Sequence, residues 1–253
     1  MKKILYILFI LSVTLSSCIQ RKNLIYMNDI QHDPPGKYEL PIYHYQLQQG
    51  DILYVNVKTL ETAYTSMFEE DRSMQQRATL GEAQAYLSGY TIDKEGQIDL
   101  PLLGKIDVLG LTVTQAKELV RQKLDNYFKE ANVDVKLMSY RVTVLGEVGS
   151  NGVILNYQDQ VTIFDVLAKA GNITDLGDRT NVLVMRPTQG EMKSFRVDLT
   201  STSVLNSEAY YLLPNDVIMV EPINAKLVRL NSPAFSFGVS IFTTLLLVIS
   251  LLN

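Results

Sequence analysis

The sequence predicts an α+β protein built from two small mixed α/β domains and a C-terminal membrane helix. Short runs of alternating apolar and polar residues indicate strands, and a capped helical pattern interrupts them once in each half of the chain. A turn motif beside a strand also occurs once in each half, and an uncharged apolar segment closes the chain. With 253 residues and 47% hydrophobic composition, the chain can form one sizeable core or two small ones.

The densest series of these patterns lies within residues 89–152. Alternation at residues 90–92 and 97–100, on either side of a turn at 94–96, predicts a pair of half-buried strands. We expect the first domain, which contains this pair, to span residues 43–145.

A helix follows this predicted strand pair. Thr112 and Gln115 match a capping box, in which each side chain accepts a hydrogen bond from the backbone N–H of the other residue. Apolar residues then recur at helical spacing as far as Tyr127. Alternation returns at residues 133–137 and 142–144, which predicts two more strands.

A second domain is expected over residues 146–222. Thr162 and Asp165 give the same signal for a helix start, and Gly171 follows as a typical helix end. The remaining alternating segments predict four strands, at residues 153–155, 181–186, 194–199 and 210–220.

The turn motif occurs at residues 45–55 and again at residues 210–220. Aligning Gly50 with Asn215 pairs Asp51 with Asp216. Asparagine tolerates left-handed backbone better than most residues, so the second turn can keep the shape of the first. An aspartate in a turn can be catalytic, but a side chain bonded to nearby backbone N–H groups is the favoured interpretation.

The N-terminus has the features of an export signal. Residues 1–17 combine two lysines with a short apolar run, and Cys18 follows immediately. The segment 15–18 resembles a bacterial lipobox, which implies that Cys18 is lipidated. Residues 18–42 are then a tether, because the Pro-Pro-Gly sequence at 34–36 disfavours helix and central strand.

The C-terminus predicts a membrane helix over residues 233–253, after a linker at 223–232. About twenty uncharged residues give a helix of roughly 30 Å, the thickness of a bilayer core. A stripe of mostly small polar residues follows one face of this helix. Such a stripe can line a water-filled lumen or form a close-packed seam between helices. The candidate pore-lining residues are Ser236, Ser240, Thr243, Leu247 and Ser250.

Several classes of function are disfavoured by the sequence. A net charge of -4 argues against nucleic acid as a partner. The one cysteine can form no internal disulfide, and metal-binding cysteine spacing is missing. His32 and His44 belong to no recognisable triad pattern, and the glycine-rich segment 146–152 lacks the lysine of a P-loop. We therefore expect no catalytic, cofactor-binding or metal site.

The order of these elements resembles the outer-membrane polysaccharide export protein family. The second domain is similar to the soluble-ligand-binding β-grasp domain of the same family. The resemblance gives a structural role to residues of the turns and of the glycine-marked segments. These residues are Gly50, Asp51, Gly89, Gly96, Pro101, Gly104, Gly146 and Asp216.

The resemblance implies a non-enzymatic transport protein in the bacterial outer membrane, facing the periplasm. It would be a lipid-anchored subunit of a homo-oligomeric ring that exports capsular or extracellular polysaccharide. An inner-membrane partner similar to a chain-length copolymerase or kinase would supply the energy. The alternative is a doubly anchored glycan-binding lipoprotein that forms no pore. In both cases the chain contacts the membrane through Cys18 and the terminal helix.

Overall fold

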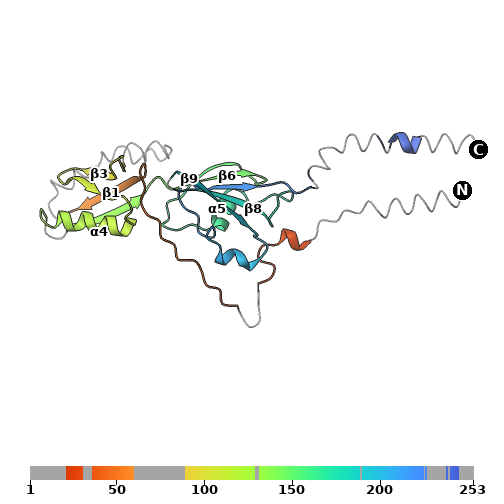
Figure 1. The fold of residues 1–253 in the computed structure, drawn as a ribbon, viewed down its shortest axis with the longest axis horizontal. Coiled ribbons are helices and arrows are strands. Elements are labelled where there is room, and N and C mark those ends of the chain that lie inside the picture. Colours follow the sequence, from red (N-terminus) through yellow and green to blue (C-terminus); the bar gives the residue numbers. More distant parts are fainter. Residues whose placement is uncertain are drawn as a thin grey trace, which may run out of the picture.

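The computed structural model describes residues 21–30, 36–59, 89–128, 131–188, 190–224, 226, 238 and 240–244. Two mixed α/β domains lie end to end (Figure 1), each around its own hydrophobic core. The predicted mixed α/β class is confirmed. Both cores consist mainly of aliphatic side chains, which supply most of the apolar burial.

The N-terminal domain contains one three-stranded sheet, one hairpin and one helix. The sheet has the order β2-β1-β5, and both neighbours of β1 are antiparallel to it. The elements are β1 (Ile52–Lys58), β2 (Tyr90–Thr91), β3 (Gln97–Leu100), β4 (Gly104–Asp107), α4 (Val113–Leu124) and β5 (Asn132–Leu137). Figure 1 shows α4 lying along β1 and β5.

The predicted pairing of residues 90–92 with 97–100 is wrong. β2 pairs with β1, whereas β3 forms its ladder with β4. Only the intervening turn is as expected, since the Asp93 N–H donates to the Gln97 carbonyl at 2.9 Å. β4 was not predicted from the sequence. A tight turn with left-handed backbone at Leu102 and Gly104 reverses the chain only three residues after β3 ends.

Helix α4 begins as predicted. Thr112 and Gln115 form the complete capping box, with N···O distances of 2.8 and 3.2 Å. Ala116, Val120 and Leu124 are buried on the core side. The predicted continuation to Tyr127 is wrong: the helix ends at Leu124, and Tyr127 is 56% exposed.

The C-terminal domain is built on a five-stranded sheet with the order β7-β6-β10-β8-β9. β6 and β10 are parallel, and the other neighbours are antiparallel. Residues from α5 and the 3-10 helix η3 share the core beneath one face of this sheet (Figure 1). The elements are β6 (Arg141–Gly146), β7 (Gly152–Leu155), α5 (Ile163–Lys169), β8 (Val182–Thr188), β9 (Glu191–Val197), η3 (Thr202–Asn206) and β10 (Val217–Val220).

Most of the predicted elements of this domain are present. The capping box of Thr162 and Asp165 starts α5, and β8 and β9 form the expected hairpin. The predicted strand over 210–220 is shorter, because only residues 217–220 join the sheet. Tyr211 instead makes an isolated bridge with Thr162.

Gly146 allows β6 and β10 to approach closely where β6 ends. Its φ is +99°, and a Cβ atom built there would lie 2.0 Å from the Val220 carbonyl oxygen. The next N–H, of Glu147, donates to that same oxygen at 3.0 Å. Any side chain at position 146 would therefore separate the two parallel strands.

The two cores meet at a short connection between β5 and β6. Leu137 packs against both cores, and Tyr140 already belongs to the core of the C-terminal domain. The whole of β6 lies in the five-stranded sheet. The change of core therefore lies near residues 138–140, ahead of the boundary at 145/146 drawn from the sequence.

Part of the expected N-terminal tether docks on the C-terminal domain. After η1 (Arg21–Leu24), the backbone N–H groups of Met27 and Asn28 donate to the carbonyls of Leu199 and Thr200. Asp29 accepts hydrogen bonds from the Thr202 N–H at 2.7 Å and from the hydroxyls of Ser201 and Thr202, which caps the start of η3.

Aromatic contacts strengthen this docking. The ring of Tyr26 packs edge-on against Phe164 of α5, with ring centroids 5.7 Å apart. The Arg179 guanidinium lies 5.6 Å from the centroid of the Tyr26 ring. The Tyr26 hydroxyl donates to Asn172 Oδ1. These contacts join the N-terminal segment to the fold of the C-terminal domain.

Several predicted features lie outside the described residues. These are the signal segment 1–17, Cys18 and most of the predicted membrane helix. Residues 240–244 of that helix are described, and they are helical. Among the described residues, no helix has the length and apolar composition that a membrane span requires. The span over 233–253 therefore stays a prediction.

Candidate functional site: a cleft between two matching turns

Two turns of the same form directly precede β1 and β10, one in each domain. Gly50 has a φ of +86° and Asn215 a φ of +68°, so both turns use left-handed backbone at the same position. In each turn the next residue is an aspartate, and its N–H donates to the carbonyl three residues earlier. The sequence repeat therefore corresponds to a repeated backbone structure.

Each aspartate side chain turns back onto its own turn. Asp51 Oδ2 accepts from the Gln48 N–H at 2.9 Å, and Asp216 Oδ2 accepts from the Leu213 N–H at 2.8 Å. The two carboxylates are 3% and 0% exposed. The aspartates therefore stabilise their turns, as the interpretation based on backbone hydrogen bonds requires.

The remaining partners of Asp51 are uncharged. The Tyr45 hydroxyl donates to Oδ2 at 2.7 Å, and the Ser139 hydroxyl donates to Oδ1 at 3.0 Å. Ser139 Oγ also accepts from the Ile52 N–H at 3.2 Å. Burial raises the pKa of the Asp51 carboxyl, and hydrogen bonds from Gln48, Tyr45 and Ser139 only partly oppose this rise.

Asp216 has a cationic partner in addition. The Arg186 guanidinium donates to both carboxylate oxygens, at 2.9 and 2.8 Å. Arg186 also donates to the carbonyls of Glu208 and Tyr211, and its guanidinium lies 5.2 Å from the centroid of the Phe195 ring. One arginine from β8 thus holds the whole loop that leads into β10.

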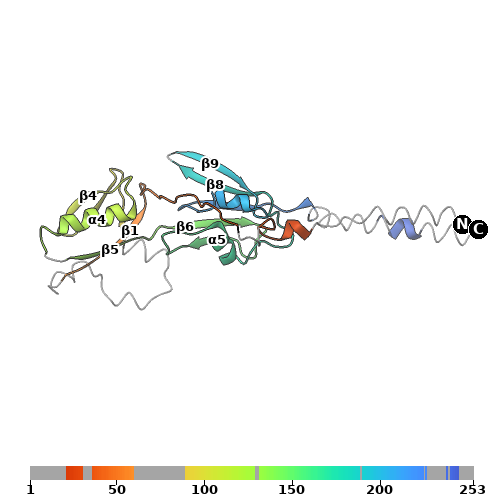
Figure 2. The ribbon, with the colours of Figure 1, turned by 90° about the horizontal axis from the view of Figure 1, so that it is seen from below.

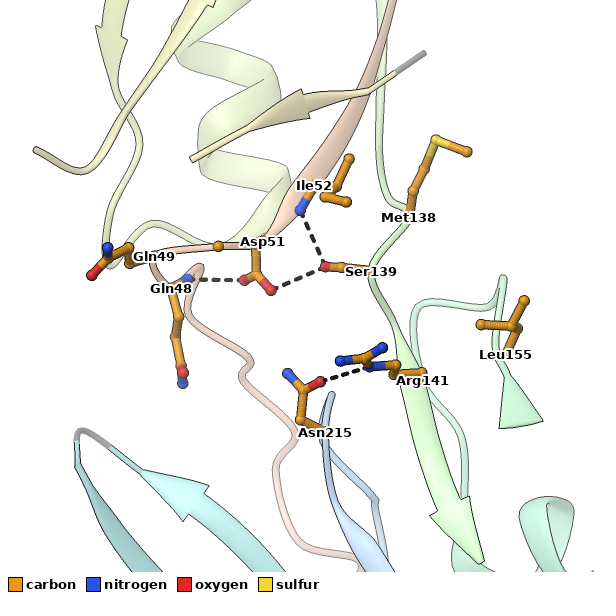
Figure 3. A pocket seen from close by; sticks show the side chains of 10 residues that line it. Gln48, Gln49, Asp51, Ile52, Met138, Ser139, Arg141, Leu155 and Asn215 are labelled. Carbon is orange, nitrogen blue, oxygen red and sulfur yellow. Dashed lines mark hydrogen bonds between the residues drawn. The ribbon is translucent and has the colours of Figure 1, made fainter. Parts of the chain in front are cut away.

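A cleft of about 380 Å³ opens between the two turns. In Figure 3, Gln48 and Asp51 of the N-terminal domain face Arg141 and Asn215 of the C-terminal domain. Arg141 Nε donates to Asn215 Oδ1 at 3.2 Å, which holds the guanidinium beside the second turn. The lining residues are Gln48, Gln49, Gly50, Asp51, Ile52, Met138, Ser139, Arg141, Leu155 and Asn215.

The chemistry of this lining suits binding rather than catalysis. Among the described lining residues, Asp51 is the only carboxylate, and its oxygens already accept three hydrogen bonds. The other polar side chains of the described lining are the amides of Gln48, Gln49 and Asn215, the Ser139 hydroxyl, which donates to Asp51, and the Arg141 guanidinium, which donates to Asn215. Within the described part of the chain, no group of three or more His, Cys, Asp or Glu residues could hold a metal ion.

Comparison with known proteins identifies the N-terminal domain. Residues 41–138 match the family model of the polysaccharide biosynthesis/export proteins. The chain is 29% identical over 147 residues to the EPS I polysaccharide export outer membrane protein EpsA of Ralstonia nicotianae. It is 25% identical over 138 residues to the protein of the same name from Ralstonia solanacearum.

The resemblance to the polysaccharide export family is therefore confirmed over residues 41–138. The matches cover 56% and 53% of this chain but only 38% and 36% of the two relatives. The matched domain, called the export domain from here on, contains β1 to β5 and the first of the two turns. This family consists of transport proteins, which agrees with the prediction that the chain is not an enzyme.

The motif residues of the export domain are distributed over its loops. Gly50 and Asp51 line the cleft. Gly89 precedes β2, Gly96 has positive φ in the turn before β3, and the Pro101–Gly104 segment joins β3 to β4. These positions shape the export domain but lie outside the cleft lining.

Of the candidate pore-lining residues, only Ser240 and Thr243 are described. The Thr243 hydroxyl donates to the Ser240 carbonyl at 2.9 Å, within the helical segment. Ser236, Leu247 and Ser250 lie outside the described residues, as does the predicted lipidation site Cys18. Their roles stay predictions.

Two residues on the C-terminal side of the cleft are absent from the predicted site residues. Ser139 and Arg141 lie on either side of Tyr140, at the connection between the two domains. A polar pair between two predicted strands was the available signal. With the domain boundary predicted at 145/146, Ser139 and Arg141 were expected inside the first domain and not at the junction of the two.

Proposed function

We propose that this chain is a lipid-anchored subunit of an oligomeric outer-membrane channel that exports capsular or extracellular polysaccharide. The family match over residues 41–138 carries this proposal. The relatives are named as polysaccharide export outer membrane proteins, which supports the same location and cargo for this chain. The β-grasp identity of the C-terminal domain is part of the proposal and rests on the motif resemblance.

The positions of the two chain ends support two anchors on one side of the fold. η1 and residues 221–224 lie at the end of the C-terminal domain that faces away from the export domain (Figures 1 and 2). Lys226 forms an ion pair with Glu147, which fixes the chain where it leaves the domain. An acylated Cys18 and a membrane helix over 233–253 would then attach the same end of the protein to the membrane.

The outer face of the five-stranded sheet supports oligomer formation. The core helices occupy the other face, and strand register aligns seven apolar side chains here. Leu145 and Val153 are 38% and 52% exposed. Apolar surface of this kind favours contact with another protein surface. The seven residues are Leu145, Val153, Leu155, Leu183, Met185, Val217 and Met219.

A ring needs this face to meet a different face of the neighbouring subunit, since a contact between two identical faces gives a closed dimer. The terminal helices of the ring would form the wall of the channel. Ser236, Ser240, Thr243, Leu247 and Ser250 would face the lumen. Energy for export would come from an inner-membrane partner similar to a chain-length copolymerase or kinase.

The size of the purified full-length protein in detergent tests this proposal. We expect a multi-subunit particle that gives ring-shaped class averages in the electron microscope, and Met219→Asp should dissociate it by burying a charge in the contact. A monomeric wild-type protein would instead support the alternative, a doubly anchored glycan-binding lipoprotein without a pore.

Thiol labelling tests the proposed lumen separately. In intact cells, Ser240→Cys and Thr243→Cys should react with small water-soluble thiol reagents, because thiolate forms in water. Ile241→Cys should react poorly, because thiolate formation is disfavoured in hydrocarbon. Equal labelling at positions 240 and 241 would show that the terminal helix has no face directed at a water-filled lumen.

A further inference from the structure

The docked N-terminal segment makes the tether much shorter than the sequence predicts. Fully extended, residues 18–42 reach roughly 80 Å at about 3.3 Å per residue. In the structure, the Met27 and Asn28 N–H groups bond to the C-terminal domain, and Met27 is only nine residues after Cys18. At most about 30 Å of chain therefore separates Cys18 from this domain.

Specific contacts hold this segment in place. Met27 has a φ of +43°, a left-handed conformation that a non-glycine residue keeps only where its surroundings hold it. Its N–H donates to the Leu199 carbonyl at 3.0 Å, and Tyr26 packs edge-on against Phe164. Asp29 accepts three hydrogen bonds at the start of η3. The docked part of the tether therefore begins at Tyr26.

Two aliphatic side chains directly before the docked part are exposed. Leu24 and Ile25 are 36% and 42% exposed, whereas Tyr26 and Met27 pack against the core. Adjacent aliphatic side chains gain free energy when apolar surroundings replace water. Leu24 is six residues after Cys18, so an acyl group on that cysteine keeps this pair within about 20 Å of the membrane.

The charged side chains of this segment suit the same surroundings. Lys22 is exposed, and a cation close to a bilayer is attracted to anionic lipid headgroups. Asp29 is the one acidic residue between positions 21 and 30, and hydrogen bonds from Ser201 and Thr202 direct its carboxylate to η3. A cation beside adjacent aliphatic residues is typical of segments that lie in a membrane interface.

We propose that Leu24 and Ile25 insert into the headgroup region of the membrane that holds the acylated Cys18. Because the residues that follow dock on the C-terminal domain, this contact seats that domain directly on the bilayer. Residues 221–224 lie at the same end as η1 (Figures 1 and 2), and the predicted membrane helix begins seven residues after Lys226. This inference rests on the proposed lipid anchor and names the surface that the domain meets.

Lipid quenching of a fluorescent label tests the inference. Ile25→Cys in the full-length chain carries bimane on its only free thiol, because acylation consumes the thiol of Cys18. The protein is reconstituted in vesicles of phosphatidylethanolamine and phosphatidylglycerol, with a spin label near the lipid headgroup. We expect lipid quenching at least about threefold stronger than at a control position far from the membrane, because the label lies at the interface. Leu24→Cys gives the same measurement if Ile25→Cys does not fold.

Ile42→Cys is the matched control. Ile42 is 83% exposed, and the next residue, Tyr43, packs against the core of the export domain. The export domain lies at the other end of the protein from η1 (Figure 1). A label at position 42 should therefore be quenched by iodide in the water and only weakly by the lipid. The unsubstituted protein, treated with the same reagent, shows whether Cys18 has kept a free thiol.

Equal lipid quenching at positions 25 and 42 in an acylated protein would overturn only this inference. A label at position 25 that neither the lipid nor iodide quenches lies against a neighbouring subunit, which also overturns the membrane contact. Bimane on the unsubstituted protein means that Cys18 is not acylated, and the lipid anchor of the proposed function then fails together with this inference.

Discussion

The two turns have the same backbone but stabilise their buried aspartates differently. Asp51 and Asp216 both accept the N–H three residues earlier, at 2.9 and 2.8 Å. Asp216 receives two more hydrogen bonds from the Arg186 guanidinium, whereas Asp51 receives them from the hydroxyls of Tyr45 and Ser139. The turn sequence determines where the carboxylate lies, and more distant residues determine its electrostatic environment.

A buried carboxylate can thus be held either by a cation, as Asp216 is, or by neutral hydrogen-bond donors alone, as Asp51 is. A buried ion pair depends on both members, because removal of one leaves an uncompensated charge. A carboxylate bonded only to neutral donors already bears the cost of burial, which is why its pKa is raised. Burial raises the pKa of both carboxyls, but only Asp216 has a cation that opposes the rise. We therefore expect the second turn to be the more sensitive of the two to loss of a partner side chain.

The largest effect is expected for the ion pair of the second turn. Arg186→Met leaves the Asp216 carboxylate, which is 0% exposed, without a cation and frees the carbonyls of Glu208 and Tyr211. The C-terminal domain should lose about 3–5 kcal/mol of unfolding free energy. Urea titration followed by far-UV circular dichroism measures this, since the chain has no tryptophan.

Arg196→Met is the matched control for this variant. Its ion pair with Glu221 is about half exposed on both sides. Such surface pairs contribute less than about 1 kcal/mol, so the control should remain close to the wild type. If both variants lost a similar amount of unfolding free energy, burial of the Arg186–Asp216 pair would not explain how much that pair stabilises the domain.

The sequence predicted the elements that depend on local signals. Both capping boxes were found, because each requires only residues three positions apart. The pairing of β3 with β4 was missed, because strand partners depend on contacts that periodicity does not encode. The docking of residues 26–29 was missed because the partners of Met27 and Asp29 lie more than 170 residues later.

A smaller effect with a distinct pH dependence is expected for the first turn. At pH 7, Asp51→Asn should change the unfolding free energy by no more than about 1 kcal/mol. The variant loses one acceptor but no longer buries a charge. Because the folded pKa of Asp51 is raised, the folded state binds a proton where the unfolded state does not. The wild type should therefore gain stability relative to Asp51→Asn as pH falls from 7 through the raised pKa toward 4.

Urea titrations of both proteins at a series of pH values measure this difference. Asp99→Asn, at an exposed position on β3, is the control for removal of one negative charge. A stability difference that moves in the opposite direction as the pH falls would show that the hydrogen bonds outweigh burial and that the pKa of Asp51 is lowered.

The cleft itself was only half predictable. The paired turns, with Gly50 and Asn215 at matching positions, were visible as a sequence repeat. Their approach to one another depends on the connection at residues 138–140, where Ser139 bonds to Asp51 and the following residue joins the other core. No local pattern of the sequence contains that arrangement, because it follows from how the two domains are joined.

A similarly small effect is expected for substitution of Gly50, at the left-handed position of the first turn. A Cβ atom at Gly50 would meet no other atom within 4 Å, so a substitution there costs only the backbone strain of positive φ. Gly50→Ala should therefore lower the unfolding free energy of the export domain by about 1 kcal/mol. Gly50→Asn, which copies the second turn, should lower it by less, because asparagine tolerates this backbone region.

In the second turn, Asn215→Ala has the same strain and also loses the contact with Arg141, so it should cost more than Gly50→Ala. Urea midpoints of the three variants give this order directly, and a Gly50→Asn protein less stable than Gly50→Ala would show that the two turns are not interchangeable.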